Sequence, residues 1–73
     1  MNAETEAEIM STFDATMIVE GQWEMAGVEP SEEKFIEAAQ RLIDTGLCWQ
    51  LQGYFGRVCQ ALINDGRCTP RVH

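Results

Sequence analysis

The chain has 73 residues, of which 45% are hydrophobic, and a net charge of −7 at pH 7. This length allows a single domain, and the hydrophobic content excludes a chain that is disordered throughout. No apolar run is long enough to span a membrane, and the N-terminus lacks the basic and apolar regions of a secretory signal.

We therefore expect one domain over residues 1–73, with no membrane partner, that stays in the cytoplasm with its thiols reduced. The charges are divided unevenly along this domain. Residues 1–37 hold ten acidic side chains and one lysine, whereas residues 38–73 hold two acidic side chains and four arginines. The acidic half is either a solubilising surface or one pole of a dipolar molecule that stacks on itself or docks a basic partner.

The first predicted element is an acidic helix over residues 3–20. Large apolar residues recur in it at helical spacing, namely Ile9, Met10, Phe13, Met17 and Ile18. We assign Phe13 to the core. Gly21 is expected to end the helix, so that residues 1–21 form an acidic N-terminal unit.

Residues 22–30 form a connector that is not simply polar, because it contains large apolar side chains. These side chains either fold back as a lid over the core or stay exposed as a binding patch. If they are exposed, Trp23 and Met25 are candidate partner-binding residues, together with the neighbouring carboxylates of Glu20 and Glu24. A short helical turn at the start of the connector is compatible with the sequence.

The second predicted helix covers residues 31–45. Ser31 is placed to cap its N-terminus, and Gly46 is placed to end it in a left-handed conformation. The apolar face of this helix includes Phe35 and Leu42, and both are assigned to the core.

The segment 47–52 has a different period. Its large apolar residues, Leu47, Trp49 and Leu51, alternate with other residues. A period of two predicts an extended or irregular segment. We expect this segment to be wedged between the second and third helices, with its three large side chains in the core.

The third predicted helix covers residues 54–65, with Phe55 and Leu62 on its buried face and Gly66 just after its end. Residues 67–73 are expected to form a tail. The predicted fold class is therefore all-α, a small bundle of three main helices.

The second and third helices belong to an internal repeat with an offset of twenty residues. When residues 35–48 are aligned with residues 55–68, six of fourteen positions are identical. The identical pairs are Phe35 and Phe55, Gln40 and Gln60, Leu42 and Leu62, Ile43 and Ile63, Gly46 and Gly66, and Cys48 and Cys68. Residues 31–66 are therefore expected to form a helical hairpin of two related units.

Three cysteines and the terminal histidine form a conceivable zinc site of the Cys₃His type, with Cys48, Cys59, Cys68 and His73 as ligands. Their spacing lacks the close pair of cysteines that forms the rigid knuckle of structural zinc sites. Free thiols that pack as small apolar residues are the favoured interpretation, and no metal or other cofactor is assigned.

The start of the third helix is a candidate anion-binding site. Backbone amides near Gly53 and Gly56, with the guanidinium of Arg57, would hold a phosphate or carboxylate there. The structural alternative is that Gly53 relieves strain in the turn and that Gly56 allows the segment 47–52 to pack closely on the helix.

Direct DNA binding through a helix–turn–helix is disfavoured, because the connection between the helices is longer than in the common motif and arginines are few. A DNA mimic, in which the acidic first helix blocks a DNA-binding protein, is an alternative. No group of residues has the spacing of a catalytic site, so we expect that the protein is not an enzyme.

Residues 42–57, followed by Leu62, Ile63 and Gly66, resemble a group of small proteins encoded by phages of actinobacteria, mycobacteriophages among them. The shared pattern is L-I-x-x-G-L-x-W-x-L-Q-G-x-x-G-R, then L-I-x-x-G. The resemblance covers about residues 35–66, and Cys59 stands where a small residue such as alanine is usual. It implies an accessory role during infection, in the cytoplasm of the host, and no particular mechanism.

These observations predict a non-enzymatic phage accessory protein that acts by protein–protein binding, either to a second copy of itself or to a host protein. The alternative prediction is a regulator linked to nucleic acid, which would be a DNA mimic that inhibits a DNA-binding protein or a weak DNA binder.

Overall fold

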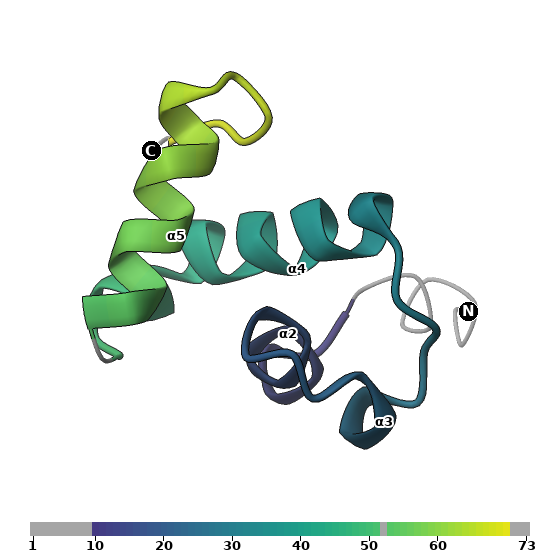
Figure 1. Cartoon of the computed structure of the whole chain (residues 1–73). Coiled ribbons are helices and arrows are strands. Elements are labelled where there is room, and N and C mark those ends of the chain that lie inside the picture. Colours follow the sequence, from purple (N-terminus) through teal and green to yellow (C-terminus); the bar gives the residue numbers. More distant parts are fainter. Residues whose placement is uncertain (1–9, 52, 71–73) are drawn as a thin grey trace, which may run out of the picture.

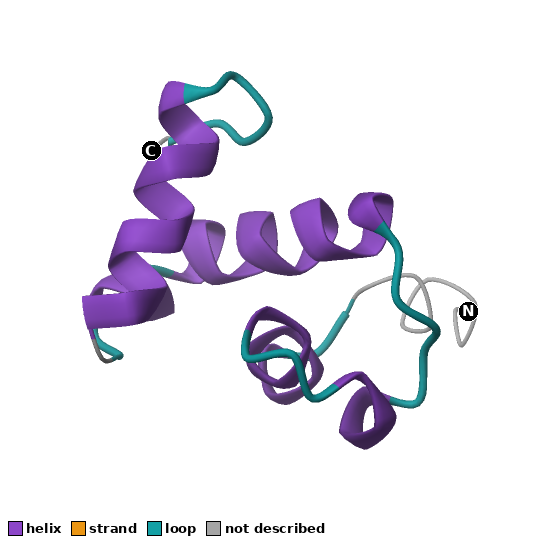
Figure 2. Ribbon diagram, in the orientation of Figure 1, coloured by secondary structure: helices purple, strands orange, loops and turns teal. Residues whose placement is uncertain are grey.

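The computed structural model describes residues 10–51 and 53–70. Its elements are α2 (Thr12–Val19), α3 (Trp23–Ala26), α4 (Glu32–Thr45), the 3₁₀ helix η1 (Leu47–Trp49) and α5 (Gly53–Asn64). The described residues contain helices, turns and loops but no strand, which confirms the all-α class (Figure 2). In Figure 1, α4 lies in the middle, α2 and α3 lie on one side of it, and α5 crosses its C-terminal end steeply.

The core is built around one stripe of α4. Four residues of this stripe have no exposed surface, namely Ala38, Ala39, Leu42 and Ile43. Their spacing places them on one side of a helix. Because Ala38 and Ala39 are small, other elements approach the α4 backbone closely. The Cys59 sulfur on α5, for example, lies 3.9 Å from the carbonyl oxygen of Ala39.

Helix α2 begins later than predicted. Ser11 has an extended backbone (φ −69°, ψ 156°), and its hydroxyl accepts a hydrogen bond from the Asp14 amide at 3.0 Å. Ser11 is therefore an N-cap, and a continuous helix over residues 3–20 is ruled out at this position. Residues 3–9 of that prediction lie outside the described part of the chain. The predicted end of the helix is confirmed, because Gly21 follows it with a φ of 88°.

Phe13 is not a core residue, because its side chain is 56% exposed. The buried residues of α2 are Ala15, Ile18 and Val19. Successive helical residues are about 100° apart, so Phe13 lies about 200° from Ala15, on the other side of the helix. The prediction was wrong because α2 is apolar on both sides, and its sequence pattern does not select the side that meets α4.

The segment 47–52 is irregular, as predicted, but its first part is not extended. Leu47–Trp49 forms η1. A 3₁₀ helix has three residues per turn, so the side chains of Leu47, Cys48 and Trp49 point in three different directions. Cys48 is completely buried, whereas Trp49 is 48% exposed, so the assignment of Trp49 to the core is wrong. Leu47 and Leu51 are half-buried against the core.

The bounds of α4 and α5 agree with the prediction to within one residue. Leu42 and Phe55 are buried as predicted, and Phe35 and Leu62 are half-buried against the core. The two helices do not lie side by side as a hairpin, however, since α5 crosses α4 at a steep angle (Figure 1).

The internal repeat has a counterpart in the local structure. Gly46 and Gly66 end their helices with nearly equal φ angles of 78° and 82°. In each copy the glutamine amide donates a hydrogen bond to the residue four positions later. Gln40 Nε2 lies 2.9 Å from Asp44 Oδ1, and Gln60 Nε2 lies 3.1 Å from Asn64 Oδ1. Each copy of the repeat therefore specifies a helix, a hydrogen bond between two exposed side chains on it, and a left-handed glycine that ends it.

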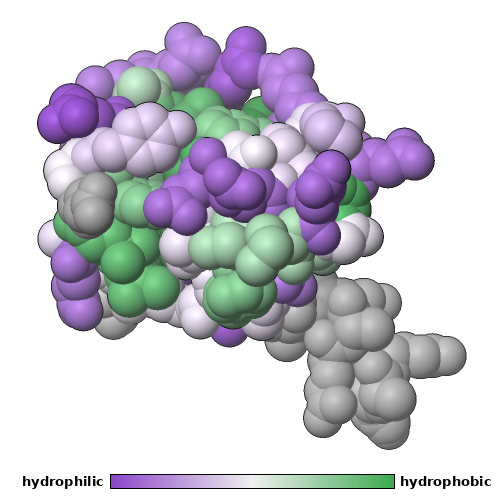
Figure 3. Space-filling model, turned by 60° about the horizontal axis from the view of Figure 1, so that its bottom comes forward, coloured by the Kyte–Doolittle hydropathy of each residue, from purple (hydrophilic) through white to green (hydrophobic). Residues whose placement is uncertain are grey.

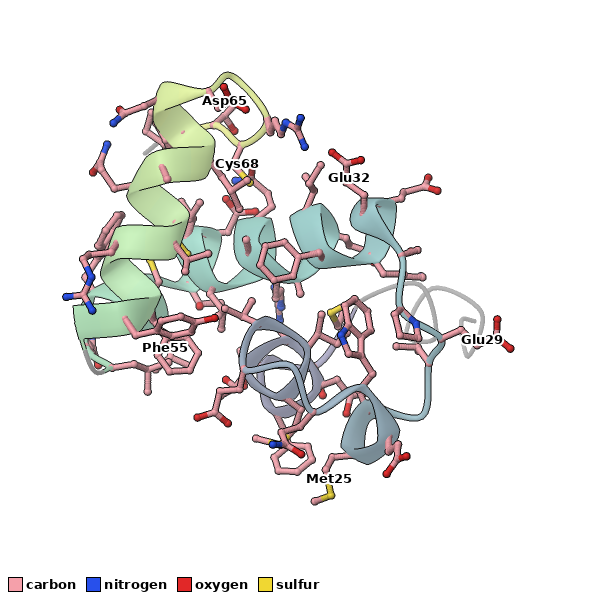
Figure 4. The ribbon with its side chains drawn as sticks, in the orientation of Figure 1. Met25, Glu29, Glu32, Phe55, Asp65 and Cys68 are labelled. Atoms are coloured by element: carbon pink, nitrogen blue, oxygen red, sulfur yellow. The ribbon has the colours of Figure 1, made fainter. Side chains whose placement is uncertain are left out.

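The residues after α5 are not a free tail. The Thr69 amide donates to Gln40 Oε1 at 2.8 Å, and Gln40 Nε2 donates to the Thr69 carbonyl at 2.9 Å. Cys68 is buried and directed toward α4, with its thiol 3.7 Å from the carbonyl oxygen of Ile36 (Figure 4). The chain therefore returns to α4 after Gly66, and residues 71–73 of the predicted tail lie outside the described part.

Two glycine substitutions should shift stability in opposite directions. Gly66→Ala is expected to lower the free energy of unfolding by about 1–2 kcal/mol, because an alanine is strained at a positive φ. Gly56→Ala is expected to raise it by roughly 0.5–1 kcal/mol, since the new Cβ would lie 3.5 Å from the Trp49 ring, an ordinary contact. Urea unfolding measures both values, and equal effects would contradict the left-handed end at Gly66.

A second pair of substitutions tests the orientation of α2. Phe13→Ala is expected to change the free energy of unfolding by less than about 1 kcal/mol, because the side chain is mostly exposed. Leu42→Ala is expected to cost about 2–5 kcal/mol, because Leu42 is fully buried. A large loss in the Phe13 variant, measured by thermal or urea unfolding, would place Phe13 in the core after all.

Candidate functional site

The predicted partner-binding residues lie on α3 and at the end of α2. Met25 is 60% exposed and points away from the rest of the molecule (Figure 4). Glu20 and Glu24 are exposed. Trp23 is half-buried and packs against the core. Trp23 therefore contributes to a lid over the core, which is one of the two alternatives predicted for the connector, while Met25 remains exposed.

The structure adds Phe13 to these residues. Among the described residues, Met25 and Phe13 are the two most exposed large hydrophobic side chains. The helices α2 and α3, which carry them, pack against each other. We call the face that includes Phe13, Glu20, Glu24 and Met25 the α2–α3 surface. Figure 3 turns this side forward and shows hydrophobic residues gathered on it, with hydrophilic residues beside and between them.

An open hollow lies beside α3 at one side of this surface. Its volume is about 530 Å³, and its apolar lining comes from Trp23, Val28 and Pro30. The carboxylates of Glu24 and Glu29 also line it. A hollow with an indole, aliphatic groups and carboxylates suits an apolar group that carries a positive charge nearby.

The segment that forms the α2–α3 surface contains acidic residues and no basic residue. Residues 10–30 include four carboxylates and no basic residue. The ion pairs among the described residues lie elsewhere. Lys34 pairs with Glu37 within α4, and Arg67 pairs with Glu32 and with Asp65. Among the described residues, Glu20, Glu24 and Glu29 therefore take part in no ion pair.

The candidate anion site at the start of α5 is only partly assembled. A Cβ on Gly53 would lie 3.1 Å from Arg57 Nη1, so the guanidinium lies over the first turn of α5. Gly56 faces the ring of Trp49 and the carbonyl of Cys48, which agrees with its predicted structural role. Gln52 lies outside the described residues.

The described arginines do not form one basic patch. Arg57 is on α5, and Arg67 is engaged by Glu32 and Asp65. Arg41 lies in a hollow of about 470 Å³ along α4, together with Met10, Ile36 and several carboxylates. This distribution does not resemble the basic footprint that a DNA duplex requires.

The three thiols are all buried. Burial raises the pKa of Cys48 and of Cys68, and burial together with the charge of the neighbouring Cys48 raises the pKa of Cys59 to about 12. They are therefore protonated at neutral pH, which makes them poor nucleophiles and poor metal ligands. Within residues 10–51 and 53–70, no group of three or more potential ligands is placed to hold a metal ion, and His73 lies outside these ranges.

The raised pKa values predict a loss of stability in alkaline solution. Unfolding releases each thiol to its ordinary pKa, about 8.5, so the free energy of unfolding should fall as the pH rises above that value and continue to fall up to about 12 for Cys59. Urea unfolding over a pH series measures the slope. Cys59→Ala should show a shallower slope than the wild type, and identical slopes would contradict a raised pKa at Cys59.

The protein is a small all-α domain, and its α2–α3 surface contains both apolar and acidic residues. Residues 22–73 match a family model described as a domain of unknown function, DUF7417. The match covers most of the chain, and the protein belongs to this family. No curated protein and no solved structure matches the chain.

The family match begins directly after Gly21. It includes α3, α4, η1 and α5, whereas α2 lies before it. The α2–α3 surface therefore spans the boundary of the matched region, with Phe13 outside it and Met25 inside it. Among the described helices, none has the length and apolar character needed to cross a membrane.

Proposed function

We propose that this protein acts by binding another protein through the α2–α3 surface and has no catalytic activity of its own. The observation that carries the proposal is that α2 is apolar on two sides while α4 and α3 cover only one of them. Ala15, Ile18 and Val19 are buried, and Phe13 on the other side is mostly exposed. A helix that is hydrophobic all round is normally buried, so the exposed side of α2 needs a cover.

The size of the apolar surface supports this interpretation. Burying a large hydrophobic side chain gains about 1.5–3 kcal/mol, and Phe13 and Met25 are both left largely in water. Exposed aromatic and methionine side chains on neighbouring elements are typical of protein-binding surfaces. A partner that covers both would also stabilise a domain whose own core is small.

The resemblance of residues 35–66 to proteins of actinobacteriophages supports an accessory role during infection. In that role the protein would act in the cytoplasm of the host, and its partner would be a host protein or a second copy of itself. The lack of any residue group with the spacing of a catalytic site supports a role that depends on binding.

An alternative is a regulator linked to nucleic acid, and the uncompensated carboxylates of the α2–α3 surface favour its DNA-mimic form over a weak DNA binder. A mobility-shift assay over a salt series separates the two forms. A DNA binder shifts duplex DNA less as salt increases. A mimic shifts no DNA but releases a DNA-binding protein from its site.

The protein-binding proposal is tested with Phe13→Ser/Met25→Ser. Both side chains are exposed, so the variant is expected to fold, which circular dichroism checks. Sedimentation shows self-association, and affinity capture from host lysate shows other partners. We expect the double variant to lose at least 80% of the captured or self-associated protein, about 1 kcal/mol or more of binding free energy.

Trp49→Ser is the matched control, because Trp49 is a similarly exposed hydrophobic residue outside the α2–α3 surface. It should retain the partner at a temperature where it is folded. A strictly monomeric wild type that captures nothing, or a capture that the double variant leaves unchanged, would refute the proposal.

A further inference from the structure

The proposed function leaves the chemistry of the partner open, and the α2–α3 surface restricts it. All four methionines of the chain lie within its first 25 residues, and three of them, Met10, Met17 and Met25, belong to the described part. Met17 is half-buried one helical turn after Phe13, and Met25 is mostly exposed. Methionine is unbranched and polarisable, so a surface that contains it adapts its shape to an apolar partner.

The charges beside these apolar side chains have one sign. Glu20, Glu24 and Glu29 are exposed, and none of them takes part in an ion pair with another described residue. A second copy of the chain docked through the same surface would bring these carboxylates close to their equivalents, and like charges across an interface are destabilising. A partner with basic residues around an apolar centre would instead complement them.

The secondary structure of the protein restricts the form of the partner. The described residues contain no strand, so an extended peptide finds no sheet edge with which to pair. An amphipathic helix needs only an apolar surface for its own apolar side, with charges at the edges. The hollow lined by Trp23, Glu24 and Glu29 offers a lysine or arginine of such a helix two carboxylates and part of an indole.

We infer that the α2–α3 surface binds a basic amphipathic helix of another protein, whose apolar side covers Phe13 and Met25 and whose lysines or arginines meet Glu20, Glu24 and Glu29. This inference rests on the proposed function, because it assigns a partner class to the same surface. It excludes a symmetric dimer through this surface as the main assembly.

The test uses fluorescein-labelled peptides of about 18 residues, which form about five helical turns. The first contains leucine at i, i+3, i+4 and i+7 positions and lysine elsewhere. The second replaces lysine with glutamate, the third replaces it with glutamine, and the fourth has the composition of the first in scrambled order. Fluorescence anisotropy with the full chain measures Kd from low to high salt.

The first peptide should bind more tightly than the other three, and more weakly as salt increases. Phe13→Ser/Met25→Ser should weaken its binding at least tenfold. Glu20→Gln/Glu24→Gln should weaken it about two- to tenfold, which is the range for two exposed charge pairs. Glu33→Gln/Glu37→Gln changes the net charge equally but alters the hollow along α4, and it should leave Kd within about twofold.

Three results would overturn the inference. The scrambled peptide could bind as tightly as the first, or both carboxylate variants could weaken binding equally, and either result would mean unspecific attraction between opposite charges. The glutamine peptide could bind as tightly as the lysine peptide and lose its binding in the Phe13 and Met25 variant. That third result would remove the basic partner while leaving the proposed function intact.

When no peptide binds, the capture experiment still shows whether only the basic helical partner is refuted or the proposed function as well. If Phe13→Ser/Met25→Ser still abolishes self-association or capture from lysate, the proposed function holds and the helical basic partner is refuted. If the double variant leaves both self-association and capture unchanged, both proposals are refuted.

Discussion

The small size of Ala38 and Ala39 is the constraint on which the rest of the structure depends. These residues lie on the central helix, where α2 packs from one side and α5 crosses near the C-terminal end. A larger side chain at either position would separate α4 from a neighbouring element, because a packed core does not absorb added volume without strain. The close approach of Cys59 to the Ala39 carbonyl depends on this space. Because α4 and α5 cross steeply, the two helices contact each other over a short length. The 3₁₀ helix η1 and the residues after Gly66 pack against α4 beside this crossing.

Local signals explain what could be predicted from the sequence. Ser31 caps α4 through its hydroxyl, and Gly46 and Gly66 end α4 and α5 in the left-handed conformation. These features depend on residues a few positions apart, so the sequence contains all the information that they need. The orientation of α2 depends on contacts between distant segments. Because both sides of α2 are apolar, periodicity alone could not exclude Phe13 from the core.

The candidate site was predicted in part for the same reason. Met25, Glu20 and Glu24 were identified because a connector that contains large apolar and acidic residues is unusual. Phe13 is absent from the predicted site because its helical spacing with other apolar residues assigns it to the core. One signal could have identified it. Apolar residues occur on both sides of α2, and in so small a bundle one of these sides is a candidate for an exposed surface. Trp49 was misplaced because alternation over six residues cannot distinguish an extended segment from a 3₁₀ turn followed by a bend.

The boundary of the family match has a consequence for how this domain can change. The matched residues 22–73 include α4 but not α2, which covers part of the buried side of α4. In this chain, part of the cover of α4 therefore comes from a segment that lies before the matched residues. The inner side of α2 is constrained by α4. If the proposed function holds, substitutions on the outer side of α2 alter the choice of partner at little cost to folding, and one short helix is then enough to retarget the domain.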